Sequence, residues 1–126
     1  MARIEGKTDK APTPIAPYSQ SVRIGTTVAA SGQAGIDLAT GTYASTDVGG
    51  QTVQTFKNIA AVLEASGASL DDVIRVDVYL SDMADFPAMN AEYEKIFSKP
   101  YPARTTVGVS LPAGMKVEIT ALAVTE

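Results

Sequence analysis

Helical and strand-like spacings of apolar residues alternate along this chain. The segment 47–66 predicts a helix, because its apolar residues recur every three or four positions and so fall on one face. Thr46 or Asp47 can cap the first turn of this helix, and Gly67 suits its C-terminal end. The stripe that would face the core consists of Val53, Phe56, Ile59, Ala60 and Leu63.

A second helix is predicted over the segment 83–97. Pro100 and Pro102 follow it. Because proline lacks a backbone N–H and clashes with the preceding turn, the helix must end before them. Its inner stripe would consist of Phe86, Met89, Tyr93 and either Ile96 or Phe97.

Alternation of apolar and polar residues predicts strands in the remaining segments. The segments 21–24 and 27–31 lie on either side of Gly25 and indicate a hairpin. The segment 37–43, which contains Gly41, is predicted as a loop.

Three further strands follow the first helix. The segments 104–109 and 115–124 are the last two, and we expect them to be antiparallel neighbours because they follow one another closely. In the segment 73–80, one face would carry Ile74, Val76, Val78 and Leu80, and the other Arg75, Asp77 and Tyr79. The buried face of the last strand would carry Val117, Ile119, Ala121 and Ala123.

The order β-β-α-β-α-β-β predicts a single α+β domain over residues 1–126, with residues 1–15 as an extended lead-in. Two amphipathic helices can cover only one face of such a sheet. The other face would still carry apolar side chains, so we expect it to be buried against further copies of the chain. These side chains are Tyr79, Val107, Leu122 and Val124.

The chain contains no histidine and no cysteine. This excludes Ser-His-Asp and Cys-His nucleophilic catalysis, zinc sites built on these residues, and disulfide bonds. Catalysis must therefore use arginine, carboxylates, tyrosine, hydroxyls, backbone groups and water, and we expect no metal or cofactor.

The charge balance also narrows the choice of partner. The net charge is −4 and the 10 basic residues are scattered, which argues against a nucleic-acid partner. The apolar runs are far shorter than the ~20 residues that cross a bilayer. Residues 1–7 lack the apolar core of a secretory signal. We therefore expect a cytoplasmic protein with no membrane partner.

Candidate chemistry lies in the segment 101–107, Tyr-Pro-Ala-Arg-Thr-Thr-Val, and at Glu118 downstream. Arg104 stands inside a β-favouring run, where a core strand would carry an aliphatic residue. Guanidinium groups are rarely buried unless paired, and their planar fork matches a carboxylate. Without further context, a surface arginine on a strand edge and a solvent-facing glutamate remain the simpler interpretations.

Short motifs occur in order between residues 16 and 124. They are Ala16-Pro17-Tyr18-Ser19-Gln20, Ser31-Gly32-Gln33, Asn58, Asn90-Ala91-Glu92-Tyr93, Tyr101-Pro102-Ala103-Arg104 and Lys116-Val117-Glu118-Ile119. This ordered set closely resembles the RidA (YjgF) family of enamine/imine deaminases. The resemblance implies a chorismate-mutase-like α+β fold, with a mixed sheet and two helices on one face. It also implies a homotrimer whose sites lie in clefts between subunits.

The resemblance further implies which residues line the cleft. Arg104 would bind the carboxylate of the substrate, and the other residues expected there are Tyr18, Ser31, Gly32, Thr106 and Glu118. Many members carry Ser-Cys after the arginine, whereas this chain has Thr105-Thr106. A β-branched residue with a hydroxyl could narrow the cleft or change the substrate preference.

The residues by themselves also allow structural roles. Tyr18 can pack its ring under the proline-rich arm, and Ser31 can be a turn residue. Gly32 can serve a close backbone approach or a positive φ. Asn90 is expected to hydrogen-bond backbone groups within the fold.

The function implied is hydrolysis of reactive 2-imino and 2-enamino acids, such as 2-iminopropanoate and 2-iminobutanoate, to 2-keto acids and ammonia. Arg104 would hold the carboxylate and Glu118 would orient the water, with Tyr18 beside them. We expect Arg104 and Glu118 of one chain to share a cleft that a neighbouring subunit closes. The alternatives are a non-catalytic small-ligand-binding regulator, an RNA-directed or translation-inhibitor role, and a chaperone-like role.

Overall fold

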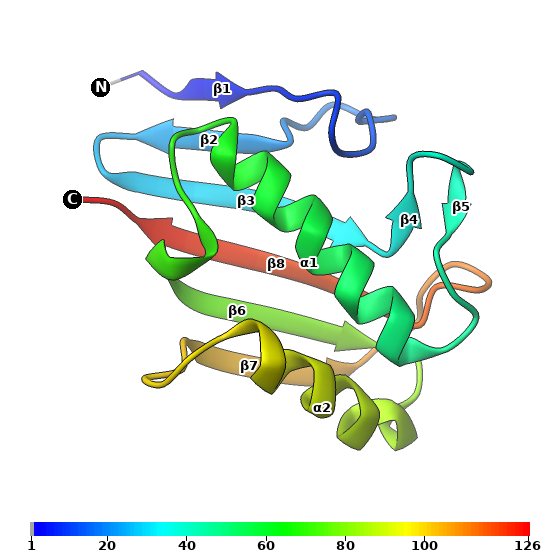
Figure 1. Cartoon of the computed structure of the whole chain (residues 1–126). Coiled ribbons are helices and arrows are strands. Elements are labelled where there is room, and N and C mark those ends of the chain that lie inside the picture. The colour runs from blue at the N-terminus through cyan, green and yellow to red at the C-terminus, as the bar shows by residue number, and fades with distance from the viewer. Residues whose placement is uncertain (1) are drawn as a thin grey trace.

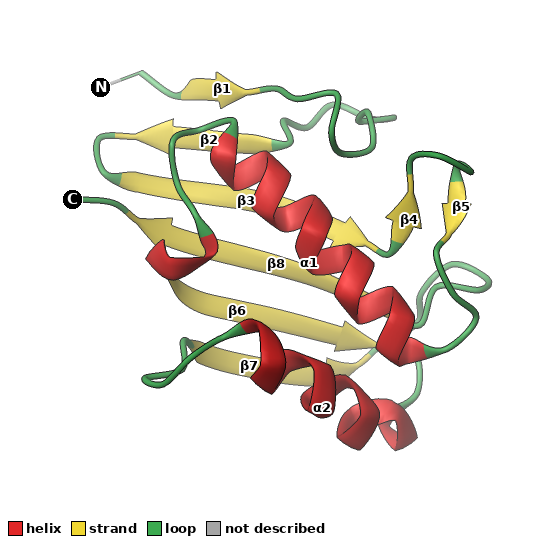
Figure 2. Cartoon of the chain, in the orientation of Figure 1, coloured by secondary structure: helices red, strands yellow, loops and turns green. Residues whose placement is uncertain are grey.

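Two helices pack on the same face of a six-stranded sheet in the computed structural model, which describes residues 2–126 (Figure 1). The strands of the sheet are β1 (Ile4–Gly6), β2 (Ser21–Ile24), β3 (Thr27–Ala34), β6 (Val73–Leu80), β7 (Ala103–Gly108) and β8 (Val117–Val124). Their spatial order is β1-β2-β3-β8-β6-β7, in which β6 and β7 run parallel and the other neighbours antiparallel. Figure 2 shows the helices, α1 (Val48–Glu64) and α2 (Phe86–Ile96), on one side of this sheet.

Helix α1 begins and ends close to the capping residues predicted from the sequence. Asp47 is the N-cap, and its carboxylate accepts a hydrogen bond from the backbone N–H of Gly50 at 2.7 Å. The same bond lowers the pKa of Asp47 below its usual range. Gly67 lies just beyond the helix with a φ of +79°, which glycine adopts without strain. The predicted cap and end of this helix are confirmed.

The structure contains three short strands that the sequence did not predict. β1 lies in the extended lead-in and pairs with β2 at the edge of the sheet. β4 (Ile36–Asp37) and β5 (Thr42–Tyr43) form a hairpin in the segment predicted as a loop. Strands of two or three residues are too short for alternation to reveal. Two 3₁₀ turns, Leu70–Asp72 and Met83–Asp85, lead into β6 and α2.

The predicted faces of β6 are wrong at its start. Val73 is buried, whereas Ile74, which was expected in the core, is 51% exposed. The pairing of β6 with β8 shifts register between Val73 and Arg75. Such a bulge inserts one residue and reverses the alternation before it. From Val76 onward the predicted faces are confirmed, since Val76, Val78 and Leu80 are all buried.

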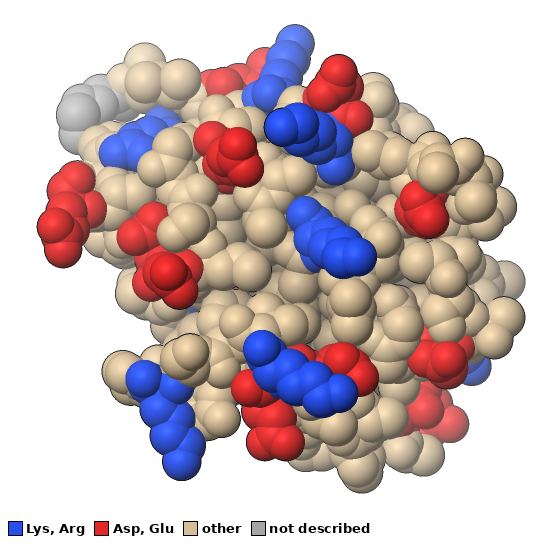
Figure 3. Space-filling view, in the orientation of Figure 1, with Lys and Arg blue, Asp and Glu red and all other residues tan. Residues whose placement is uncertain are grey.

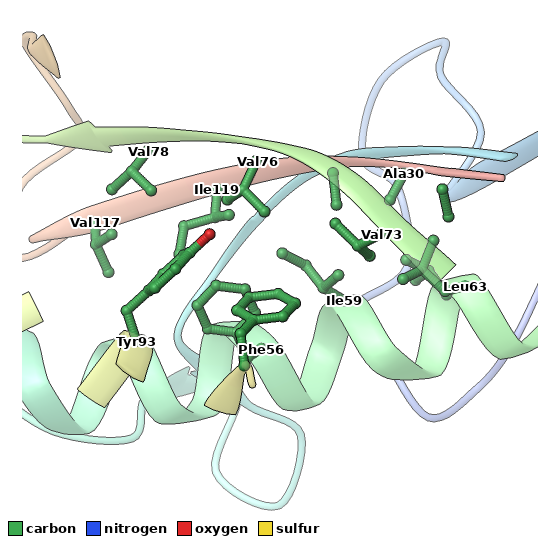
Figure 4. Close-up of a cluster of buried hydrophobic side chains, with 14 of the residues drawn as sticks. Ala30, Phe56, Ile59, Leu63, Val73, Val76, Val78, Tyr93, Val117 and Ile119 are labelled. Carbon is green, nitrogen blue, oxygen red and sulfur yellow. The ribbon is translucent and has the colours of Figure 1, made fainter. Parts of the chain in front are cut away.

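The hydrophobic core lies between the helices and the sheet. Figure 4 shows Phe56, Ile59 and Leu63 of α1 and Tyr93 of α2 pointing toward the strands. The buried stripe of α1 also includes Val62, while the predicted Val53 and Ala60 are only partly buried. In α2 the predicted stripe is confirmed, and in β8 the buried residues are Val117, Ile119, Ala121 and Ala123.

The opposite face of the sheet is not covered by either helix. Tyr79 and Leu122 are half-buried there, and Val107 and Val124 are 39% and 38% exposed. The prediction that two helices cover only one face is confirmed. Glu118, one of the candidate site residues, projects from this open face.

Candidate functional site

Arg104 lies on β7, the strand at the sheet edge next to α2. Its register partner on β6 is Val76, which is buried beneath the helices, so the arginine side chain emerges on the helix-covered face. The guanidinium carbon Cζ lies 4.6 Å from the ring centroid of Tyr93 and 5.5 Å from that of Phe86. None of the ion pairs within residues 2–126 involves Arg104. Its charge is therefore available to a ligand.

A pocket of about 290 Å³ opens beside this guanidinium, lined by Asn90, Tyr93, Glu94, Tyr101, Pro102 and Arg104. Three buried polar atoms have no hydrogen-bond partner in the described part of the chain, namely Asn90 Oδ1, the Tyr93 hydroxyl and Thr106 Oγ1. A buried polar group without a partner is costly, and Asn90 also lines the pocket, so a ligand bound there can supply the missing partner of Asn90 Oδ1. We call Arg104, Asn90, Tyr93 and Thr106 the arginine cluster.

The members of the arginine cluster differ in how well the sequence predicted them. Thr106 pairs with the buried Val78, so it shares the helix-covered face with Arg104, as a common role would require. The expectation that Asn90 hydrogen-bonds backbone groups is wrong for its carbonyl oxygen, which has no partner. Tyr93 was predicted only as a core residue. Burial raises the pKa of Tyr93, against the opposing effect of the Arg104 charge, so its hydroxyl is protonated at neutral pH.

Glu118 lies on the other face of the sheet. Its register partner on β6 is Tyr79, and both side chains project from the face that the helices leave open. The carboxylate passes directly over Gly32, where a Cβ would lie 2.5 Å from Glu118 Oε2. The close-approach role expected for Gly32 is thus confirmed, and its φ is not positive.

Ser31 precedes Gly32 and is hydrogen-bonded to the segment that carries Tyr18. Its hydroxyl donates a hydrogen bond to the carbonyl of Ser19 at 2.6 Å, and its backbone N–H donates to the carbonyl of Gln20 at 3.0 Å. Ser31 is not a turn residue, because it lies within β3 beside the register shift between Ala30 and Gln33. We call Glu118, Gly32, Ser31 and Tyr18 the glutamate cluster.

Tyr18 is 47% exposed and borders a hollow of about 640 Å³ beside the N-terminal arm. Gln20 anchors that arm, because its buried side-chain amide bonds the backbone of Thr8, Ala11 and Pro12. The segment that carries Tyr18 is therefore held in place, and the Tyr18 ring borders the same hollow as Thr13 and Pro14 of the arm. Its exposed position fits contact with a ligand or with another copy of the chain.

A methyl group at Gly32 should redirect the Glu118 carboxylate without unfolding the chain. Only the flexible end of the glutamate opposes the added Cβ, so Gly32→Ala should change the melting temperature by no more than about 3 °C. If Glu118 acts in catalysis, kcat should fall by about tenfold or more. Gly49→Ala is the matched control, since its Cβ would make only ordinary contacts. An unchanged kcat in Gly32→Ala would show that the position of this carboxylate does not matter.

The two clusters do not meet within one chain. β6 lies between β7 and β8, so the last two strands are not neighbours, and the prediction that they pair is wrong. Arg104 and Glu118 also project from opposite faces of the sheet. The expected cleft that contains Arg104 and Glu118 of the same chain is therefore not formed.

Within residues 2–126, no group of three or more acidic side chains is placed to hold a metal ion. No helix in the same range is long and apolar enough to cross a bilayer.

The chain is similar to known proteins over nearly its whole length. The family model described as endoribonuclease L-PSP matches residues 8–125. A protein of Dermatophagoides farinae named 2-iminobutanoate/2-iminopropanoate deaminase is 43% identical over 120 residues, which is 94% of each chain. A Salmonella typhimurium protein of the same name is 40% identical over 121 residues, covering 93% of this chain and 94% of its own length.

A solved structure extends the similarity to three dimensions. The crystal structure of RidA from an Antarctic Psychrobacter superimposes with a TM-score of 0.91 at 41% identity, covering 97% of this chain and 99% of the other. The motifs, the fold and these similarities along nearly the whole chain lead to one conclusion. This chain belongs to the RidA (YjgF) family, whose family model is described as endoribonuclease L-PSP.

Proposed function

We propose that this chain hydrolyses 2-imino and 2-enamino acids to 2-keto acids and ammonia, with Arg104 binding the substrate carboxylate and Glu118 orienting water. The observation that carries the proposal is the Arg104 guanidinium, which has no ionic partner within residues 2–126 and borders an open pocket. A guanidinium in this setting can form two charge-assisted hydrogen bonds to one carboxylate. The relatives named as deaminases of 2-iminobutanoate and 2-iminopropanoate support this substrate class.

The chemistry needs no covalent nucleophile. Water adds to the electrophilic carbon of the C=N bond and gives a carbinolamine, which then expels ammonia and leaves the C=O of the keto acid. Glu118 is suited to accept a proton from the attacking water and to return it to the departing nitrogen. Because free imines already hydrolyse in water, positioning and modest acid–base help are sufficient.

Such a site requires more than one copy of the chain. Arg104 and Glu118 lie on opposite faces of the sheet with β6 between their strands. A neighbouring copy can bring its own glutamate cluster to the arginine cluster, and the partly exposed apolar side chains of the open face supply surface for the contact. We therefore propose a homotrimer in which each cleft combines Arg104 of one subunit with Glu118, Gly32 and Tyr18 of the next.

An RNA-directed role, which the description of the family model names, has less support in this chain. RNA binding favours a continuous basic surface, and the net charge here is −4. On the helix-covered face, basic and acidic side chains are interspersed (Figure 3). Cleavage of a labelled single-stranded RNA that is lost in Arg104→Ala would favour this alternative.

The direct test is catalysis in a defined mixture. With 2-iminobutanoate generated in place by an amino-acid oxidase, the protein should accelerate the loss of imine and the release of 2-oxobutanoate and ammonia. The rate should rise in proportion to protein concentration and remain unchanged when a chelator is added, because the proposed steps use only side chains and water. Turnover that depends on an added divalent ion would contradict the mechanism, and so would an imine lifetime that the protein does not shorten.

A further inference from the structure

The Arg104 guanidinium rests on an aromatic surface provided by α2. Its Cζ lies 4.6 Å from the centroid of the Tyr93 ring and 5.5 Å from that of Phe86. Phe86 and Tyr93 are seven residues apart, which is about two helical turns, so both rings project from one face of the helix. A guanidinium held over a ring face keeps its in-plane N–H groups free for hydrogen bonds.

The Tyr93 ring is itself immobilised by the core. The residue is only 5% exposed, and its ring centroid lies 4.9 Å from that of Phe97 and 5.8 Å from that of Phe56. Figure 4 shows the Tyr93 ring facing the strands, close to Phe56. A side chain packed in this way cannot follow the arginine, so the arginine must adapt to the ring.

The Tyr93 hydroxyl contributes little to this packing. It is buried and has no hydrogen-bond partner in the described part of the chain. An unpaired buried hydroxyl is destabilising, so phenylalanine should be tolerated at this position. The ring and the hydroxyl can therefore be tested separately.

We propose that Tyr93 is a positioning residue, whose ring sets the plane of the Arg104 guanidinium so that two of its N–H groups meet one carboxylate. The inference rests on the proposed function, because it takes Arg104 as the residue that binds the carboxylate of the ligand. It adds the reason why the guanidinium is held in a productive orientation before the ligand arrives. Such preorganisation increases affinity by lowering the entropic cost of binding.

The experiment measures the Kd of a stable carboxylate, 2-oxobutanoate, by calorimetry, together with kcat and KM for the imine. Tyr93→Phe keeps the ring and should leave Kd within about twofold, whereas Tyr93→Leu removes the aromatic face and should raise Kd and KM by about three- to tenfold. The effect on kcat should be smaller, because the guanidinium contacts the carboxylate in both ground and transition states. Phe97→Leu controls for a general loss of core packing, since that ring is not one of the two beneath the guanidinium. Because Phe97 helps to hold the Tyr93 ring, this variant should raise Kd by less than Tyr93→Leu does.

A double-mutant cycle separates positioning from general packing. In an Arg104→Lys background, Tyr93→Leu should have little further effect on Kd, because a lysine ammonium has no plane to be set. An equal loss in both backgrounds would overturn the proposal. A loss in Tyr93→Phe as large as that in Tyr93→Leu would also overturn it, because the hydroxyl rather than the ring would then be responsible.

Two further results keep the test decisive. If Tyr93→Leu does not fold, the NMR chemical shift of the Arg104 Nε–Hε proton in the wild-type protein decides between the two outcomes. Shielding by the ring face must move this proton upfield of the Nε–Hε protons of Arg3, Arg23 and Arg75. The absence of that shift would overturn the proposal. If the wild-type protein releases no ammonia but binds 2-oxobutanoate through Arg104, the proposed deaminase function fails while the role of Tyr93 is still decided by Kd. If no Arg104-dependent binding occurs, both fail.

Discussion

Replacing Arg104 with lysine should lower kcat/KM for a 2-imino acid by at least about tenfold, which corresponds to about 1.4 kcal/mol. Lysine keeps the positive charge but loses the planar fork that binds a carboxylate through two hydrogen bonds. Alanine removes the charge as well and should lower kcat/KM further. The measurement is steady-state kinetics on imine generated in place. Arg75→Lys is the matched control, because Arg75 is an exposed arginine with an Asp77 carboxylate at 3.7 Å, where the fork contributes little.

The stability of the Arg104 variants separates a functional role from a structural one. Arg104 is half-buried and takes part in no ion pair within residues 2–126, so Arg104→Ala should keep its melting temperature within about 3 °C of the wild type. A variant that unfolds at much lower temperature, yet retains its activity per folded molecule, would return Arg104 to a structural role. Thermal unfolding followed by circular dichroism, on the samples used for kinetics, makes the comparison direct.

Local patterns in the sequence predicted the elements well. The predictions of the inner stripe of α2 and of the alternation in β8 were correct. An element that is buried on one side carries apolar residues at a regular spacing, and this spacing can be read from the sequence alone. The bulge at the start of β6 was not predictable in this way. A register shift depends on the partner strand, and nothing in Val73 or Ile74 marks it.

The pairing of the strands was harder to predict than their positions. β7 pairs with β6 because a strand–helix–strand connection returns parallel to its first strand, and α2 is that connection. β8 pairs with both β6 and β3, so β6 separates it from β7. The short connection between β7 and β8 suggested a hairpin, but length alone does not distinguish a hairpin from a connection that passes over one strand.

The candidate site shows the same limit. Arg104 was recognisable because a guanidinium in a β-favouring run is unusual, and the family resemblance identified Glu118. Tyr93 was assigned only to the core, since its position in the α2 stripe is that of an ordinary buried aromatic residue. One ring can contact the core on one side and a guanidinium on the other. The spacing of apolar residues along a helix shows that the ring is buried, but not that it also contacts a guanidinium.

Mixing two inactive variants should restore activity if each cleft combines two copies of the chain. Arg104→Ala lacks the side chain that binds the substrate carboxylate, and Glu118→Ala lacks the side chain that orients water. Each variant alone should therefore be nearly inactive. The structure favours recovery, because the two side chains lie on opposite faces of one sheet and can share a cleft only across an interface between copies. In any closed trimer that contains both variants, about one cleft in three receives both intact residues.

The chains must exchange for this test to be valid. The two variants carry different tags, are unfolded together and refolded, and the mixed assemblies are purified through both tags in turn. Sedimentation should first give the wild-type protein a mass about three times the 13.1 kDa of one chain. The control mixes Arg104→Ala with the double variant Arg104→Ala/Glu118→Ala, which contains no intact arginine and should recover nothing.

The decisive measurement is the rate of 2-iminobutanoate hydrolysis by the mixed Arg104→Ala and Glu118→Ala assemblies, relative to wild-type protein refolded in the same way. A site shared between subunits predicts about a third of the wild-type rate, with no recovery in the control mixture. Mixed assemblies that are purified intact and yet remain inactive would contradict it, as would a wild-type protein that sediments as a monomer and is fully active.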